Sequence, residues 1–385
     1  MQTINPHLAS FRCIRCSTLY PVGDFQEGCP KCLAESHPAS VVPVYDEAMP
    51  SPFEEHFGRR MERFGNWLPY KVFTSLGEGD TPLVDLPRLA AQCGLEALSI
   101  KLESANPTGS HKDRMSAQFV ARAKDRNVPS VIAASSGNAG CSIAAYAAAA
   151  GLPCTIVTTP AISAPWRRAI EMTGASIVYV EDSLERWEIV RRKVREEGCL
   201  SATNYLVPPV GSDPYGVEGY KTLGYELAEN QAVSVADAIF VPTARGDLLW
   251  GIYRGLAEAM EAGKLRAMPK LVAVEPFPRL ECVLAGKDVR SHFPGKSLLA
   301  SIGGATATYQ SWLAVTRSGG TAISVAESDV LDDRQLLAHH GHYLELSAAA
   351  ALTGLRTLAA SADKGASIRR AVLIGTSHGY KEAAD

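Results

Sequence analysis

Residues 98–126 read LSIKLESANPTGSHKDRMSAQFVARAKDR and hold a strand, a turn and a helix in that order. LSIKLE is an apolar strand candidate, and the last 14 residues of the stretch repeat apolar side chains such as Met115 and Phe119 at helical spacing. The turn between them contains Asn106, Pro107 and Gly109 and leads directly to Lys112. The stretch is therefore one strand–loop–helix unit with a lysine at the junction.

The same alternation continues through most of the chain. Because strands that alternate with helices form parallel sheets covered by helices, we expect an α/β fold. The length of 385 residues predicts two domains with mostly parallel sheets, plus a short appendage. Strands are predicted at 98–103, 130–135, 154–159, 176–180, 236–242, 270–276 and 370–377, and helices at 113–126, 139–151, 164–174, 183–198, 216–231, 248–263 and 347–361.

The composition narrows the class of protein. A formal net charge of −3 gives no reason to expect nucleic acid or an anionic membrane as a partner. No apolar run reaches the length of a membrane-spanning helix. The first residues, MQTINPHLASFRC, lack the basic start and apolar core of a signal peptide, so we expect a cytoplasmic protein.

Four of the nine cysteines form a cluster with the spacing C-x2-C-x12-C-x2-C. Two Cys-x-x-Cys pairs supply the four thiolates of a closed, structural Zn²⁺ site, and the other five cysteines are expected to be reduced thiols. The alternatives are four unrelated surface thiols, or a nucleic-acid-binding ribbon with too few basic neighbours. We predict a zinc ribbon over residues 12–36 with the ligands Cys13, Cys16, Cys29 and Cys32.

Lys112 has two interpretations. Burial and the positive end of the following helix lower the pKa of a lysine, and a neutral amine is needed to react with a carbonyl cofactor. A lone lysine after a turn is more commonly a solvated surface residue. The residues around it leave both interpretations open.

Three further loops follow predicted strands: SSGNAG at 135–140, VPTARGDLLWG at 241–251 and GTSHGYK at 375–381. Amides at a helix N-terminus bind carboxylates and phosphates, although Ser136 or Asn138 could instead only cap a helix. Because the carboxyl ends of parallel strands meet at one edge, we expect these loops to converge with Lys112 on one crevice.

These motifs resemble those of fold-type II pyridoxal 5′-phosphate (PLP) enzymes, and most closely those of threonine synthases. ESANPTGSHKDR resembles the family's lysine motif, and SSGNAG matches its substrate-carboxylate loop. GEGDTPL at 77–83, VEGYKTLGYEL at 217–227 and TSHGYK at 376–381 are similar to three further elements, in family order. An N-terminal cysteine ribbon also occurs in a subset of threonine-synthase-like proteins.

The resemblance implies a homodimer that acts on a small amino acid. It implies a large PLP-binding domain over 45–113 and 205–385, and a small substrate-side domain over 114–204. Lys112 is implied to join PLP covalently and to move the substrate's α-proton. The implied cofactor-binding residues are Lys112, His111, Asn138, Thr243, Ala244, Arg245, Gly246 and Thr376, and the implied substrate-binding residues are Ser110, Ser135, Ser136, Ala139 and Arg114.

The sequence departs from the threonine synthase pattern at three places. His111 replaces the usual Phe, TARGD at 243–247 replaces a glycine-rich phosphate loop, and EDSLERW at 181–187 replaces a Gly-Asn or Gly-Asp turn. Arg245 could pair with the cofactor phosphate, whereas Asp247 would repel it unless it turns away or caps the helix.

The leading expectation is elimination and hydration of O-phosphohomoserine to give threonine. Such a substrate needs a second phosphate site, for which the candidates are Arg114, Arg167, Arg168 and Arg245. The first alternative is a β-eliminating or β-replacing enzyme: a serine/threonine dehydratase, an ammonia-lyase or a synthase of an unusual amino acid. The second alternative is a binding protein that kept the fold and lost the cofactor.

Overall fold

The computed structural model describes residues 3–47, 49–53, 58–182, 185–361 and 368–382. The chain divides into two compact units. The first, here the lysine unit, comprises Met1–Asp80 and Lys112–Thr222 with the last four residues; the second, here the C-terminal unit, comprises Thr81–His111 and Leu223–Lys381. Residues 45–80 and 205–222 thus group with the lysine helix, whereas the sequence analysis assigned them to the larger domain.

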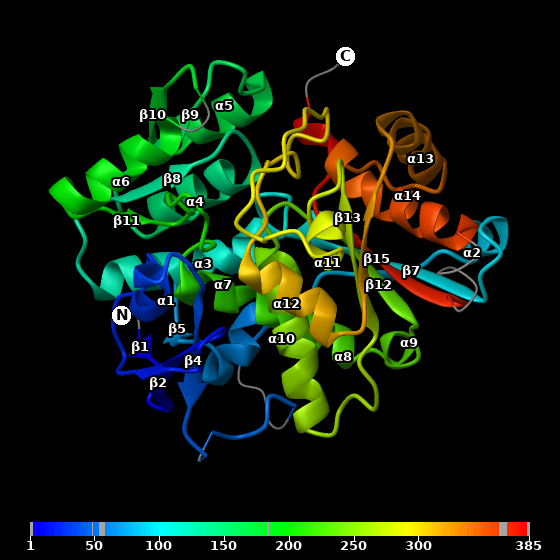
Figure 1. Cartoon of the computed structure of the whole chain (residues 1–385), viewed down its shortest axis with the longest axis horizontal. Helices are drawn as coiled ribbons and strands as arrows, with labels where there is room; N and C mark the ends of the chain where they lie inside the picture. The colour runs from blue at the N-terminus through cyan, green and yellow to red at the C-terminus, as the bar shows by residue number, and fades with distance from the viewer. Residues whose placement is uncertain (1–2, 48, 54–57, 183–184, 362–367, 383–385) are drawn as a thin grey trace. The chain divides into compact units, whose positions relative to one another are not determined.

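The lysine unit contains a parallel sheet in the order β10-β9-β8-β11. Helices precede or follow each strand, as the alternating pattern predicts (Figure 1). Residues 183–184 of the predicted helix 183–198 lie outside the described residues. The elements are α3 (Lys112–Asp125), β8 (Val131–Ala134), α4 (Asn138–Ala149), β9 (Cys154–Thr158), α5 (Ala164–Met172), β10 (Ser176–Tyr179), α6 (Glu185–Glu197) and β11 (Leu200–Ser201).

The predicted helix over 216–231 is present as several shorter pieces, and Gly219 within them packs directly against α3. A Cβ at Gly219 would overlap the carbonyl oxygen of Arg114. The pieces are α7 (Pro214–Val217), η3 (Glu218–Tyr220), α8 (Lys221–Ala228) and α9 (Gln231–Ser234). This close approach explains why residues up to Thr222 belong to the lysine unit.

An antiparallel ribbon, in the order β3-β2-β4, opens the lysine unit. Its elements are β2 (Leu8–Cys13), β3 (Leu19–Tyr20), α1 (Pro30–Ala34) and β4 (Val41–Tyr45). The carbonyl of Gly23 accepts hydrogen bonds from Arg122 Nη2 of α3 at 3.0 Å and from the Tyr215 hydroxyl at 2.7 Å. The loop between the two cysteine pairs is therefore anchored to the lysine helix.

Residues 60–72, which precede α3 in the chain, also group with it. Strand β1 (Thr3–Ile4) pairs with β5 (Tyr70–Val72), which follows the 3₁₀ helix η1 (Arg60–Trp67). The Gln118 side chain of α3 accepts from the Tyr70 amide at 3.0 Å and donates to the Tyr70 carbonyl at 3.1 Å.

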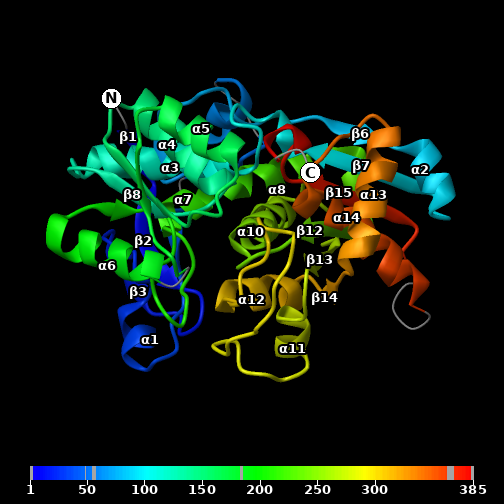
Figure 2. The same ribbon diagram turned by 90° about the horizontal axis from the view of Figure 1, so that it is seen from above.

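The C-terminal unit is built on a six-stranded sheet in the order β14-β13-β12-β15-β7-β6, parallel except for β6. Helix α14 packs on it through an alanine-rich face, so that the core joins apolar residues of the sheet and of α14 (Figure 2). The elements are β6 (Leu83–Asp85), α2 (Pro87–Gln92), β7 (Ala97–Leu102), η2 (Glu103–Ala105), β12 (Ala238–Pro242), α10 (Asp247–Glu261), β13 (Lys270–Glu275), α11 (Leu280–Leu284), α12 (Tyr309–Arg317), β14 (Thr321–Ser324), α13 (Glu327–His339), α14 (Leu346–Ala360), β15 (Arg370–Gly375) and η4 (Gly379–Lys381).

Three neighbouring parallel strands of this sheet position the predicted loops. Strand β15 lies between β7 and β12, and the segments 103–111, 376–378 and 243–246 follow their carboxyl ends. These loops therefore leave the same edge of the sheet. The predicted α/β fold is confirmed. No helix in the described part of the chain is long and apolar enough to span a membrane.

Candidate active site

Lys112 is the first residue of α3, at the end of the turn that follows β7 and η2. Gly109 makes this turn possible: its φ is +77°, and a Cβ there would overlap the imidazole of His378. The Lys112 ammonium lies 5.7 Å from the ring centroid of Tyr220, and the lysine is only partly buried. The predicted strand–turn–helix geometry is present, with the amine where the helix begins.

The two residues after Lys112 are fully buried in the lysine unit. Asp113 accepts a hydrogen bond from the Ser142 hydroxyl at 2.6 Å, and Arg114 donates to the Thr222 hydroxyl at 2.9 Å. Arg114 therefore fixes the segment 217–222 against α3. The other arginine candidates of this unit, Arg167 and Arg168, lie exposed on α5.

The SSGNAG loop connects β8 to α4 and is organised by its first serine. Ser135 Oγ accepts from the backbone amide of Gly140 at 2.9 Å and from that of Gly137 at 3.3 Å. Asn138 and Ala139 form the start of α4, after the N-cap Gly137, which has no side chain to close the helix. Backbone amides at a helix start are donors suited to a carboxylate.

Three side chains outside the predicted site residues contact this loop: Thr158, Arg186 and Trp166. Ser136 Oγ accepts from Thr158 at 2.9 Å and from Arg186 Nη1 at 2.9 Å. Arg186 comes from the EDSLERW segment, so this departure brings a guanidinium to the SSGNAG loop. The Trp166 ring lies against Gly137, at 3.4 Å from a Cβ built there, and its buried indole N–H has no partner among the described residues.

The GEGDTPL element is linked to α4 through a buried carboxyl group. Glu78 is fully buried, and its Oε2 accepts from the Tyr146 hydroxyl at 2.5 Å and from the Leu76 amide at 3.0 Å. Burial, with the charges of Asp113 and Glu78, raises the pKa of the Tyr146 phenol well above its usual range. Tyr146 therefore remains a neutral donor to Glu78.

In the C-terminal unit, the residues before Lys112 are bonded to the end of β15. The His111 amide donates to the Thr376 carbonyl at 3.0 Å, and its Nδ1 lies 3.2 Å from the same oxygen. Ser110 pairs with Ser377, and its buried hydroxyl has no hydrogen-bond partner in the described part of the chain. Burial and the Lys381 charge lower the pKa of His378, which favours a neutral imidazole.

The TARGD loop connects β12 to α10. Gly246 is left-handed, with φ +89°, and a Cβ there would overlap Ser311. The Arg245 carbonyl accepts from Thr308 Oγ1 at 2.6 Å, and the Gln310 amide donates to Asp247. Asp247 is thus directed to Gln310, while Gly246 is the N-cap of α10 without a side-chain cap.

This arrangement fits a bound phosphate. The uncapped amides of a 15-residue helix point at the loop, and they carry the positive end of the helix dipole. Burial lowers the pKa of Arg245, partly offset by the charge of Asp247. The unpartnered hydroxyl of Ser110 lies two residues before Lys112 and offers a further polar contact to a ligand.

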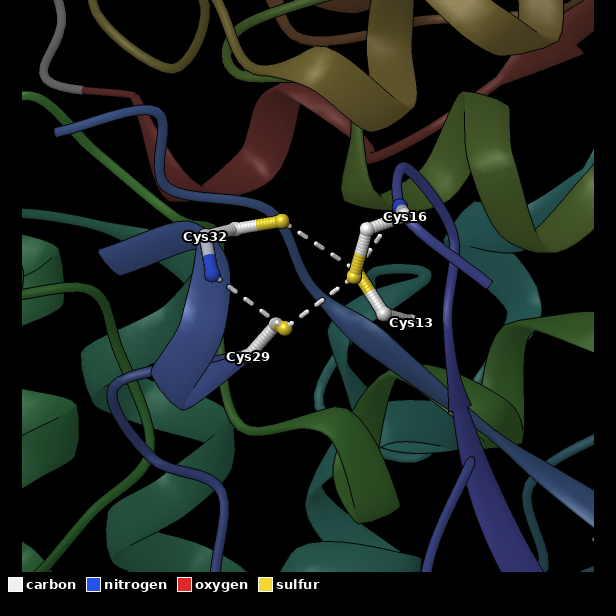
Figure 3. A group of neighbouring side chains, drawn as sticks. All are labelled: Cys13, Cys16, Cys29 and Cys32. Carbon is white, nitrogen blue, oxygen red and sulfur yellow. Dashed lines mark hydrogen bonds between the residues drawn. The ribbon is translucent and has the colours of Figure 1, made fainter. Parts of the chain in front are cut away.

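The four predicted zinc ligands come together in the ribbon. Their sulfur atoms all lie within 4.8 Å of one another, with 3.6 Å from Cys13 to Cys32 and 3.7 Å from Cys16 to Cys29 (Figure 3). Four ligands at about 2.3 Å from a tetrahedral Zn²⁺ would be about 3.8 Å apart. The amides of Cys16 and Cys32 point at the Sγ atoms of Cys13 and Cys29, as in a thiolate knuckle.

Several side chains that contact the SSGNAG and TARGD loops lie in stretches of sequence that carry no motif. Arg279 Nη2 donates to the Thr243 carbonyl at 2.7 Å, and Arg279, Thr308 and Gln310 all lie more than 30 residues after the TARGD loop. Arg186 lies in a segment that differs from the family pattern, and this difference was the only hint of its place. Trp166 has the spacing of an ordinary core residue of an amphipathic helix.

Comparisons with known proteins agree with this geometry. A family model described as pyridoxal-phosphate dependent enzyme matches residues 74–376. A threonine synthase of Methanocaldococcus jannaschii is 28% identical over 389 residues, which cover 96% of this chain and 92% of the relative. A threonine synthase of Methanosarcina acetivorans is 30% identical over 293 residues, covering 74% of this chain and 71% of the relative.

Two solved structures share the fold. An O-ureido-L-serine synthase has a TM-score of 0.62 and 21% identity, covering 78% of this chain and 90% of that chain. A maize serine racemase has a TM-score of 0.65 and 22% identity, covering 77% and 88%. Because the family model spans most of the sequence, with the lysine turn and the loops at 135–140 and 243–247 inside the match, this chain belongs to the pyridoxal-phosphate dependent enzyme family.

Proposed function

We propose that this enzyme converts O-phosphohomoserine and water into threonine and phosphate, with PLP attached to Lys112. One observation carries the proposal: the likeness to a threonine synthase extends over 96% of the chain, and thus includes segments outside the general family match. Segment 217–222 belongs to the motif at 217–227 that resembles threonine synthases, and it is packed on the lysine helix through Gly219 and Arg114.

When bound, PLP supplies an electron sink that weakens bonds at and beyond the α-carbon of an amino acid. Lys112 Nζ would hold the cofactor and afterwards accept the α-proton of the substrate. Thr243, Ala244, Arg245 and Gly246 would bind the cofactor phosphate, Asn138 its phenolic oxygen and Thr376 its pyridine nitrogen. A neutral hydroxyl at that nitrogen moderates the sink and favours loss of a leaving group over transamination.

The substrate carboxylate would be bound by the uncapped start of α4. Ser135 orders this loop, and the amides of Ser136 and Ala139 are the proposed donors. Ser110 would contribute its unpartnered hydroxyl. His111, held by Thr376, would pack beside the cofactor. Arg114 is bonded to Thr222, so its contribution to substrate binding is proposed to be orientation of α3.

The test is to supply O-phosphohomoserine to the PLP-loaded enzyme and to measure phosphate and threonine together. Equal amounts of both products are expected from wild type, and none from Lys112→Ala. Lys124→Ala, on the last turn of the same helix, is the matched control and should retain activity. Wild-type enzyme that releases neither product would contradict the proposal.

A β-eliminating or β-replacing activity is the second candidate. The Arg186 contact to Ser136 favours it, since Arg186 comes from segment 181–187, which departs from the threonine synthase pattern. Release of ammonia from serine or threonine, without turnover of O-phosphohomoserine, would establish this candidate in place of the first. If the protein showed no absorbance change on addition of PLP, the binding-protein alternative would stand instead.

We further propose that Cys13, Cys16, Cys29 and Cys32 bind one structural Zn²⁺. The support is the sulfur geometry, the two amide–sulfur contacts and a closed set of four thiolates without an open position for catalysis. Metal analysis of the purified protein should give about one zinc per chain. Cys16→Ser should lose the metal, whereas Cys282→Ser, outside the cluster, should keep it.

A homodimer and a cytosolic location complete the proposal. All nine cysteines are free thiols, which suits a reducing compartment. Light scattering on the purified protein tests the dimer: a molar mass near twice the 41.1 kDa chain is expected, and a monomer would contradict it.

A further inference from the structure

Arg279 and Glu275 form an ion pair with both side chains fully shielded from solvent. Glu275 ends β13, and Arg279 directly precedes α11. Arg279 Nε donates to Glu275 Oε1 at 3.0 Å, while Glu275 Oε2 accepts from the amides of Arg279 and Leu280. Burial raises the pKa of Glu275, and burial lowers that of Arg279. A buried pair of this kind is costly to desolvate and is weak evidence of stability by itself.

The remaining nitrogens of Arg279 are directed at two loop carbonyls. Nη2 donates to the carbonyl of Thr243, the first residue of the TARGD loop, at 2.7 Å, and Nη1 donates to the carbonyl of Gly304. Gly304 in turn faces the guanidinium of Arg245: a Cβ there would lie 3.7 Å from Arg245 Nη1. One guanidinium thus joins the end of β13, the start of the TARGD loop and a second loop.

The TARGD loop has only one glycine with which to shape its backbone, so its conformation needs fixing from outside. Arg279 holds its first carbonyl, Thr308 holds the carbonyl of Arg245, and Ser311 closes on Gly246. With these two carbonyls engaged elsewhere, the amides at the start of α10 remain directed at the loop.

We propose that Arg279 is a positioning residue for cofactor phosphate binding. Its hydrogen bond to the Thr243 carbonyl holds the TARGD loop in the conformation that binds phosphate, a conformation that a glycine-rich loop would reach through its own backbone. The inference rests on the proposed function, since it takes Thr243–Gly246 as the phosphate site. It adds a specific consequence: loss of Arg279 weakens the binding of the phosphate group and leaves the binding of the pyridine ring unchanged.

The experiment compares the affinities of the apoprotein for PLP and for pyridoxal, which lacks the phosphate. The variant is Glu275→Leu combined with Arg279→Met, so that no unpaired charge stays buried. Binding is followed by absorbance at a temperature at which every apoprotein is folded, as checked by circular dichroism. The matched control is Asp333→Leu combined with Arg356→Met, which removes another ion pair of the same unit, between α13 and α14, and likewise leaves no unpaired charge buried.

Loss of two hydrogen bonds to the loops corresponds to a decrease in PLP affinity on the order of tenfold to 100-fold. Pyridoxal affinity should stay within about threefold, because the loop is proposed to bind the phosphate group, which pyridoxal lacks. Thr308→Val keeps the ion pair and releases the second carbonyl, so it should shift the PLP-to-pyridoxal ratio in the same direction, by about fivefold.

Equal losses for PLP and pyridoxal would show a merely structural ion pair and overturn the inference. An unchanged PLP-to-pyridoxal ratio in both variants would also overturn it, while leaving the phosphate role of the loop intact. A wild-type protein with no preference for PLP over pyridoxal would show that the proposed phosphate site itself is wrong.

Discussion

The two strand-to-helix loops, SSGNAG at 135–140 and TARGD at 243–247, both end at a glycine N-cap, and their backbones are held in different ways. In SSGNAG, Ser135 bonds the amides of Gly137 and Gly140, so the loop is largely held by its own residues. In TARGD, the conformation is held by Arg279, Thr308 and Gln310, far along the chain. The first loop matches its family pattern in sequence, and the second departs from it.

The comparison shows that a loop can lose its family signature and keep its proposed role if distant side chains take over its backbone contacts. The presence of a local motif then indicates the role of a loop, whereas the absence of the motif does not show that the role is lost. Four substitutions test this contrast between a loop held by its own residues and a loop held by distant side chains.

Gly246→Ala should be the most damaging change. It places a side chain on a left-handed residue, which costs about 1–2 kcal/mol, and the new Cβ overlaps Ser311. We expect PLP affinity to fall by on the order of 100-fold, measured by titration of the apoprotein. Gly263→Ala has a similar φ of +70° with open space around it, at the other end of α10, and is the matched control. Equal effects of the two changes would show that the Ser311 contact is irrelevant.

Ser135→Ala should disturb the SSGNAG loop and leave the binding of the PLP phosphate unchanged. It leaves the amides of Gly137 and Gly140 without their acceptor, a cost of about 1–3 kcal/mol. The KM for the amino-acid substrate should rise about 30-fold, with PLP affinity within about twofold. Ser130→Ala, at the other end of β8, provides the control. A fall in PLP affinity with unchanged KM would reverse the assignment of the two loops.

Arg186→Gln should have a smaller effect at the same loop. Ser136 keeps its bond to Thr158, so only one of its two donors is lost. We expect KM to rise about fivefold with kcat nearly unchanged, as for loss of one charged hydrogen bond near the surface. Arg192→Gln, on an exposed position of α6, should match wild type. A large fall in kcat would instead place Arg186 among the reacting groups.

Asp247→Asn should have the smallest effect, and it should strengthen binding where the other changes weaken it. The amide oxygen can still accept from Gln310, while a negative charge beside the proposed phosphate site disappears. PLP affinity should increase about threefold, by titration at low salt. Glu261→Gln, at the far end of α10, should leave the affinity unchanged. Weaker PLP binding in Asp247→Asn would mean that the carboxylate itself shapes the loop.

The long alternating elements could be predicted from the sequence. The strand LSIKLE, predicted at 98–103, is β7 at Ala97–Leu102, and the following helix begins at Lys112. Short elements could not: β11 (Leu200–Ser201) exists through pairing with β8 alone and has no local pattern. The helix predicted at 216–231 contains a 3₁₀ turn at Glu218–Tyr220 and ends its continuous part at Ala228. The close packing of Gly219 on Arg114 is a contact that periodicity does not encode.

The candidate site divides in the same way. Lys112, the SSGNAG loop and the cysteine cluster have signatures within a few residues of one another. Arg279 and Thr308 act on a loop more than 30 residues earlier, and their roles depend on sheet order, which places β13 beside β12. Nothing near Arg279 in the sequence distinguishes it from an ordinary surface arginine.

The attachment of PLP to Lys112 is tested most directly by reducing the PLP-loaded protein with borohydride and mapping the modified peptide by mass spectrometry. Our account predicts one pyridoxyl group per chain, on Lys112, and none in Lys112→Ala. A modification found on another lysine, or a protein that takes up no PLP, would contradict it.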